Sequence, residues 1–253
     1  MKRMIYRIAK LLNHNSFIGI ESGAKQECLI MGKGIAFGKK IGQTIEVPQD
    51  ARIYSLKELT DRGDAREIIN SVSPVCLELA NEILREAEAE FGDIDRSILF
   101  PIADHLDFAI RRLQRGEQIS NPLTEDIRIL FYKEYKVAGC IAPMLKEKFQ
   151  IELDEHETGY IALHVHSAIV DEKVSQAMEI ARTVRECISL VEKETGNSID
   201  VMSLAYNRLM NHVRYMVARA IHGEKLKMNL NDYMSVKFPE AFHASERICH
   251  EME

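Results

Sequence analysis

The chain of 253 residues is longer than a typical domain of about 100 to 150 residues, so two or three compact units are expected. Apolar residues make up 46% and charged residues 28% of the sequence, which is ordinary for a globular protein. No apolar run is long enough for a membrane helix, and the basic N-terminus lacks the apolar centre of a signal peptide. We therefore expect a cytoplasmic protein without membrane insertion.

Positive charge is concentrated at the N-terminal end. Residues 1–55 contain nine Lys or Arg against four Asp or Glu, whereas the rest of the chain contains 24 against 35. A small basic module on an acidic body indicates that a polyanion-binding surface, if the chain has one, lies in the N-terminal part. Charge alone does not distinguish RNA from DNA or from an acidic protein.

The basic N-terminal part is expected to form a small antiparallel sheet. Strand-like runs cover residues 5–12, 16–22, 26–32 and 44–48, and turn-rich segments separate them. A unit of this size has a small core, and pairing with a second copy of itself would stabilise it.

Within this part, the segment MGKGIAFGKKIG at residues 31–42 combines four glycines, three lysines and one phenylalanine. A tight turn needs fewer glycines, and the segment lacks the Lys-Ser/Thr ending of a phosphate-binding loop. RNA binding fits better, because bare backbone approaches a ribose-phosphate chain closely, lysines neutralise phosphates and an aromatic ring stacks on a base. The asparagines of AKLLNHNSF, residues 9–17, add amides that can read base edges.

From about Asp64 to the end, the sequence has the periodicity and composition of helices. Turn-forming segments are expected to separate these helices near residues 91–94, 115–123, 149–159, 194–200 and 222–230.

The helical part contains an internal repeat. When the sequence is shifted by 107 positions, residues 104–123 align with residues 211–230, which pairs His105 with His212 and Arg112 with Arg219. Two copies of one helical domain are therefore expected. The stretch at residues 154–168 has no counterpart, so we expect the second copy to be shorter by nature or cut.

His105 is the first candidate functional residue. It shares the expected core side of its helix with Ile102, Leu106 and Ile110, a position where a packed structural histidine is common. His212 stands at the equivalent position in the second copy. Because the histidine recurs, the sequence favours a functional role for His105 as much as a structural one.

His164 and His166 form a second candidate pair. They would share one face of a strand, or lie about 200° apart on a helix. Residues 154–157 offer further acidic and histidine side chains, but a metal site needs three or four converging ligands. Helix-terminal histidines without a metal are the alternative.

RIAKLLNHNSFI, followed by MGKGIAFGKK, resembles the co-antiterminator RNA-binding domain of BglG/LicT-type transcriptional antiterminators of bacterial sugar operons. The units around DHLDFAIRRLQRGEQISNPL and ETGYIALHVHSA resemble the phosphotransferase-system regulation domains of that family. The resemblance implies a multidomain α+β chain: a dimeric four-stranded antiparallel sheet, then two all-α helical bundles. The implied domains are residues 1–58, 66–171 and 172–253, the last incomplete at its C-terminus.

The same resemblance implies site residues and partners. The implied RNA contacts are Lys10, Asn13, Asn15, Gly32, Lys33, Phe37 and Lys39. The implied phosphate acceptors are His105, His164 and His212, while the role of His166 stays open. The implied partners are a hairpin in leader mRNA, a second copy of the chain in a homodimer, and HPr and a sugar-specific enzyme II. No cofactor, metal or catalytic residue is implied.

Two alternatives from other classes stay open at this stage. A metal-dependent hydrolase or phosphohydrolase could use Asp104, His105, His164 and His166. A DNA-binding regulator would suit the basic module, although the module has no recognisable helix-turn-helix pattern.

Overall fold

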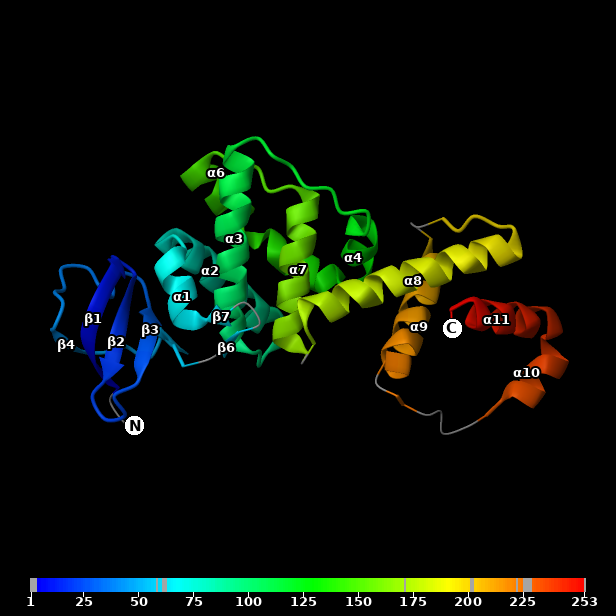
Figure 1. The fold of residues 1–253 in the computed structure, drawn as a ribbon, viewed down its shortest axis with the longest axis horizontal. Coiled ribbons are helices and arrows are strands. Elements are labelled where there is room, and N and C mark those ends of the chain that lie inside the picture. Colours follow the sequence, from blue (N-terminus) through cyan, green and yellow to red (C-terminus); the bar gives the residue numbers. More distant parts are fainter. Residues whose placement is uncertain are drawn as a thin grey trace.

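The computed structural model describes residues 4–57, 59–60, 63–170, 172–200, 203–221, 223–224 and 229–252. A β-module lies at one end of the molecule, a central helical unit follows it, and a second helical unit lies at the other end (Figure 1). This arrangement confirms the expected multidomain α+β fold class. None of the described helices is both long and apolar enough to cross a bilayer.

The β-module is a five-stranded antiparallel sheet with the strand order β4-β1-β2-β3-β5. Its strands are β1 (Ile5–Asn13), β2 (Ser16–Glu21), β3 (Glu27–Met31), β4 (Thr44–Glu46) and β5 (Arg52–Ser55). The expectation of four strands is wrong because it omits β5. This run of four residues is too short to show clear alternation, and it becomes a strand by pairing with β3, where Cys28 lies opposite Ser55.

Helices make up the rest of the fold, joined to the sheet by the short strands β6 (Leu59–Thr60) and β7 (Gly63–Asp64). The central unit contains α1 (Ala65–Ser71), α2 (Pro74–Phe91), η1 (Arg96–Ile98), α3 (Leu99–Gln114), α4 (Thr124–Leu130), α5 (Tyr132–Ala138), η2 (Gly139–Ile141), α6 (Ala142–Phe149) and α7 (Glu155–Ile169). The second unit contains α8 (Val174–Thr195), α9 (Leu204–Ile221), α10 (Asn231–Lys237) and α11 (Pro239–Met252).

Several helix breaks fall where the sequence predicts them, but the breaks between α1 and α2 and between α7 and α8 were not predicted. At the end of α8, for example, Gly196 adopts the left-handed conformation with φ of 68°, which a residue without a side chain adopts readily and which ends the helix.

Both faces of the sheet are buried. Alternation along β3 directs Cys28 and Ile30 to one face and Leu29 and Met31 to the other. The first face forms a small core with the glycine-rich segment, while the second joins the core of the central helical unit. The sheet therefore obtains from α1 and α2 of its own chain some of the apolar cover that its small size requires (Figure 1).

Polar contacts reinforce this junction. The Tyr54 hydroxyl of β5 donates to Asn81 Oδ1 of α2 at 2.7 Å, and burial raises the pKa of Tyr54 to about 12. Two turns further along α2, Glu88 pairs with Arg52 at 2.6 Å and with Arg96 at 2.7 Å. The β-module is thus held against α2 along much of that helix.

The junction is expected to weaken in acid through Glu88. The hydrogen bond from Arg52 lowers the pKa of Glu88, so the carboxylate stabilises the fold above the ordinary value of 4.5. This contribution is lost as the pH falls through the lowered folded-state value. Glu88→Gln is therefore expected to lower the melting temperature by a few degrees at neutral pH, with the difference from wild type vanishing in acid.

Thermal unfolding over a pH series measures this difference. Glu86→Gln, which removes a half-exposed carboxylate from the same helix, is the control. A constant difference between Glu88→Gln and wild type at every pH would contradict the expectation.

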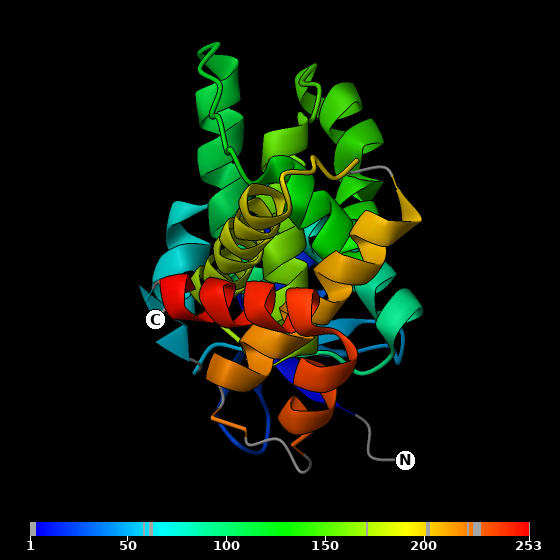
Figure 2. The ribbon, with the colours of Figure 1, turned by 90° about the vertical axis from the view of Figure 1, so that its right-hand side faces the viewer.

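The repeat in the sequence reappears in the helices. Shifted by 107 positions, Thr124–Leu130 of α4 falls on Asn231–Lys237, the bounds of α10. The same shift places α3 on α9, and α9 and α11 pack on α8 (Figure 2). Among the described residues, no helix of the second unit corresponds to α7. Large apolar side chains are exposed on this unit, namely Leu204, Tyr215, Leu230, Tyr233, Met234, Val236 and Phe238.

Candidate nucleic-acid interface and histidine cluster

The glycine-rich segment packs on the turn between β1 and β2. The Gly32 amide donates to the Asn15 carbonyl at 2.9 Å, and the Ala36 amide donates to the His14 carbonyl at 3.0 Å. Gly34 has φ of 66°, which favours glycine because the chain must turn there. The β1–β2 turn and the glycine-rich segment are separated along the chain by β2 and β3. In the fold they lie side by side and form one continuous surface.

The side-chain oxygens of Asn13 and Asn15 accept hydrogen bonds within the turn and the adjoining glycine-rich segment. Asn13 Oδ1 accepts from the Asn15 amide at 2.8 Å and from Ser16 Oγ at 2.9 Å. Asn15 Oδ1 accepts from the Gly34 amide at 2.8 Å, which ties the turn to the glycine-rich segment. These bonds fix both side chains with their NH2 groups directed away from the turn.

The two NH2 groups converge on a single oxygen atom. Asn13 Nδ2 and Asn15 Nδ2 donate to Glu78 Oε1 of α2 at 3.0 Å and 2.8 Å. This pair of donors is therefore shaped for one anionic or carbonyl oxygen, such as a phosphate oxygen or the edge of a base.

The glycine-rich segment adds an exposed ring and exposed cations. Phe37 is 68% exposed, and its ring meets the His14 ring edge to face with 5.3 Å between centroids. Lys33 and Lys39 are exposed on the same segment. His14 was not singled out from the sequence, because only the folded turn places it beside Phe37.

Lys10 lies apart from this loop surface. Its Nζ donates to Asn70 Oδ1 of α1 at 2.9 Å. The structure thus brings Asn13, Asn15 and Gly32 into direct contact, whereas Lys10 faces the helical unit. Neither Asn70 nor Glu78 was predicted, since no local pattern reports a contact between residues 60 or more positions apart.

A second polar cluster lies between α3 and α7. The rings of His105 and His164 are 5.4 Å apart between centroids, and both side chains are buried. His105 Nε2 lies 3.2 Å from Glu157 Oε2, and the Arg112 guanidinium pairs with the other oxygen of that carboxylate. Glu157 itself is completely buried.

The position of Glu157 follows from the start of α7. Asp154 caps this helix by accepting a hydrogen bond from the Glu157 amide at 2.8 Å, which sets the first turn. A cavity of about 400 Å³ adjoins the cluster, lined by Asp104, His105, Phe108, Arg112, Ile119 and Tyr160. In the sequence, Glu157 stood out only as one of several candidate metal ligands near His164 and His166, and its pairing with Arg112 was not predicted.

The remaining histidines have different surroundings. His166 Nδ1 lies 2.9 Å from Glu134 Oε1, and its Nε2 lies 3.6 Å from Glu172 Oε2. His212 is exposed on α9, so the second unit does not reproduce the burial of His105. Within the described part of the chain, no three His, Cys, Asp or Glu side chains converge as metal ligands, and nothing there favours the hydrolase alternative.

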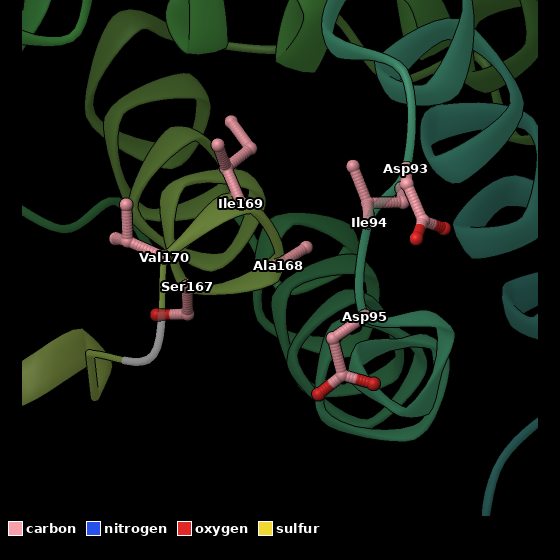
Figure 3. A pocket seen from close by; sticks show the side chains of 7 residues that line it. All are labelled: Asp93, Ile94, Asp95, Ser167, Ala168, Ile169 and Val170. Atoms are coloured by element: carbon pink, nitrogen blue, oxygen red, sulfur yellow. The ribbon is translucent and has the colours of Figure 1, made fainter.

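A larger cavity of about 450 Å³ lies between the α2–η1 connection and the end of α7 (Figure 3). The Asp95 amide donates to the Ala168 carbonyl at 2.7 Å, and the Asp95 carboxylate accepts from the amide and hydroxyl of Ser97. These groups serve to join and cap the two segments, so we assign no ligand to this cavity.

A basic β-module with converging amide donors, followed by helical units with a buried histidine pair, defines a nucleic-acid-binding regulator with helical control domains. The sequence model of the CAT RNA binding domain matches residues 6–62, and that of the PRD domain matches residues 66–168 and 185–253. The chain belongs to the PRD-containing family of BglG/LicT-type transcription antiterminators.

Individual relatives are similar to this chain over most of their length. Transcription antiterminator LicT of Bacillus subtilis is 27% identical over 246 residues, covering 96% of this chain and 88% of that protein. The beta-glucoside operon antiterminator of Dickeya chrysanthemi is 26% identical, covering 96% and 87%. The crystal structure of GlcT CAT-PRDI superposes with a TM-score of 0.55 at 28% identity, covering 66% of this chain and 99% of that chain.

Proposed function

We propose that the chain is an antiterminator of a sugar-utilisation operon, acting in the cytoplasm as a homodimer. Its β-module would bind a hairpin in leader mRNA and so prevent a terminator from forming. The observation that carries this proposal is the convergence of the Asn13 and Asn15 amides beside the glycine-rich segment, within the part that matches the CAT RNA binding domain. The similarity to LicT and to the beta-glucoside operon antiterminator supports the operon type, and no catalysis by the chain is needed.

The proposed RNA contacts combine amide donors, cations, bare backbone and one ring. They are Lys10, Asn13, Asn15, Gly32, Lys33, Phe37 and Lys39. Asn13 and Asn15 would donate to an RNA oxygen and Phe37 would stack on an unpaired base, while the lysines neutralise phosphates. The exposure of Phe37 supports its role, because an aromatic side chain with no core to fill is free to stack.

We propose the three modules at residues 1–58, 66–171 and 172–253, with His105, His164 and His212 as phosphate acceptors. HPr or a sugar-specific enzyme II would supply the phosphoryl group. The matches to the PRD domain and the closeness of His105 to His164 support this assignment. A phosphoryl group adds a charge of roughly −1.5 to −2, which changes helix packing most strongly at a buried site.

Phe37→Ala is expected to weaken binding of an RNA hairpin with an internal loop by about tenfold to a hundredfold, the loss of one stacked base. Phe108→Ala is the matched control, since Phe108 is 63% exposed but lies on α3, away from the β-module. Gel shifts at one fixed salt concentration measure both affinities.

Asn15→Asp provides a second arm of this test. Aspartate keeps the oxygen that accepts from the Gly34 amide but replaces the NH2 donor by an anionic oxygen. The variant should lose hairpin binding while the turn stays intact. Hairpin affinities equal to wild type for both Phe37→Ala and Asn15→Asp would refute the site assignment, and preference for duplex DNA would refute the class of ligand.

A further inference from the structure

We propose that Glu78 occupies the RNA-binding site of the β-module in this conformation, so that RNA and the central helical unit compete for the same two amides. This inference rests on the proposed role of Asn13 and Asn15. The intramolecular competitor is Glu78. One oxygen of its carboxylate would occupy the place of an RNA oxygen.

The contact is a convergent one. Glu78 Oε1 accepts from both Asn13 Nδ2 and Asn15 Nδ2, at 3.0 Å and 2.8 Å. The other carboxylate oxygen lies 3.2 Å from Lys148 Nζ of α6, and the Glu78 side chain is only 16% exposed. Hydrogen bonds to an ionised acceptor are stronger than those to a neutral one. The Glu78 carboxylate is therefore bound strongly by the two amide donors.

A second proposed RNA contact is also engaged by the helices. Lys10 donates to Asn70 of α1, while Asn13 and Asn15 are half-buried beneath α2. Phe37, Lys33 and Lys39 remain exposed on the glycine-rich segment. RNA can therefore reach the ring and lysines in this arrangement, but it reaches the converging amides only after Glu78 of α2 moves away from them.

The competitor is coupled to the rest of the helical unit through α2. The same helix carries Asn81 and Glu88, which contact Tyr54 and Arg52 of β5. A shift of α2 relative to the sheet would change all these contacts together. Access to the amides would then depend on how the helical unit packs, which is the unit that contains His105 and His164.

The experiment uses the full chain and a fluorescently labelled RNA hairpin whose stem is interrupted by an internal loop. Glu78→Ala is expected to bind this RNA about tenfold more tightly than wild type, the effect of removing one charge-assisted competitor. Glu82→Ala is the matched control, because it removes the same charge one turn further along α2, where Glu82 pairs with Arg85. Its affinity should stay within about twofold of wild type.

Glu78→Gln is a second variant that keeps the size and the oxygen acceptor but not the charge, and its affinity should lie between those of wild type and Glu78→Ala. The gain from Glu78→Ala should also disappear when Asn13 and Asn15 are both replaced by alanine. Without RNA, the NMR signals of the Asn13 and Asn15 NH2 groups should shift in Glu78→Ala and stay in place in Glu82→Ala.

Equal tightening by Glu78→Ala and Glu82→Ala would overturn the proposal, because net charge alone would then explain the gain. Unchanged affinity in Glu78→Ala, with binding still lost in Asn15→Asp, would overturn the competition while leaving the proposed RNA site standing. Hairpin binding that does not depend on Asn13 and Asn15 in any variant would overturn both.

Discussion

Arg112→Ala is expected to lower the free energy of unfolding of the central helical unit by about 3–5 kcal/mol, because it leaves a buried carboxylate without its cation. Glu157 is completely buried, and the Arg112 side chain that pairs with it is only 13% exposed. Urea denaturation followed by circular dichroism measures the change.

Arg128→Ala in α4 is the control. Arg128 pairs with Glu125, and both side chains are well exposed (41% and 57%), so its loss should cost about 0.2–1 kcal/mol. The double variant Arg112→Ala with Glu157→Gln should recover part of the stability, since burying a neutral amide costs less than burying a carboxylate. Equal losses for Arg128→Ala and Arg112→Ala would contradict the importance of the buried pair.

Phosphorylation of His105, proposed above, is expected to loosen the contact between α3 and α7. A phosphoryl group at Nε2 would lie where the Glu157 carboxylate now stands, 3.2 Å away, and two anions in a buried site repel each other strongly. Arg112 can neutralise only one of them. We expect amide hydrogen exchange in α3 and α7 to accelerate by at least about tenfold.

Phosphoramidate, which transfers its phosphoryl group to imidazole with release of ammonia, allows this measurement without a partner protein. Exchange is compared by mass spectrometry before and after phosphorylation in wild type, in His105→Gln and in Glu157→Gln. In Glu157→Gln the repulsion is removed and Arg112 is free to pair with the phosphoryl group, so phosphorylation should slow exchange instead. Accelerated exchange in both wild type and Glu157→Gln would exclude the proposed repulsion.

Local patterns were sufficient to predict much of the fold. Four of the five strands of the sheet and most of the breaks between long helices follow from alternation, helical periodicity and turn residues, whereas the break between α7 and α8 was not predicted. The shift of 107 positions also predicted two copies of one helical domain, and in the structure it brings α4 onto α10. These features depend on residues close together in the chain, so they can be found without a structure.

Contacts between distant segments could not be predicted in this way. β5 is a strand only because β3 lies beside it, and the second face of the sheet is buried only because α1 and α2 cover it. From the sequence, only a second copy of the β-module was expected to stabilise it. The burial of its second face by α1 and α2 of the same chain was not expected. Similarly, His105 and His212 occupy equivalent positions in the repeat, yet one is buried beside Glu157 and the other is exposed.

The sequence by itself determined the order of the modules, the charge contrast between them and the residue types available for RNA and phosphate. Composition and short-range periodicity carry that information because each depends on neighbours in the chain. Only the tertiary structure decided that Asn13 and Asn15 converge on Glu78, and that Arg112 and His105 meet at Glu157. The physical reason is that a buried carboxylate selects its partners by distance in space, where residues from separate helices and strands come within hydrogen-bonding range.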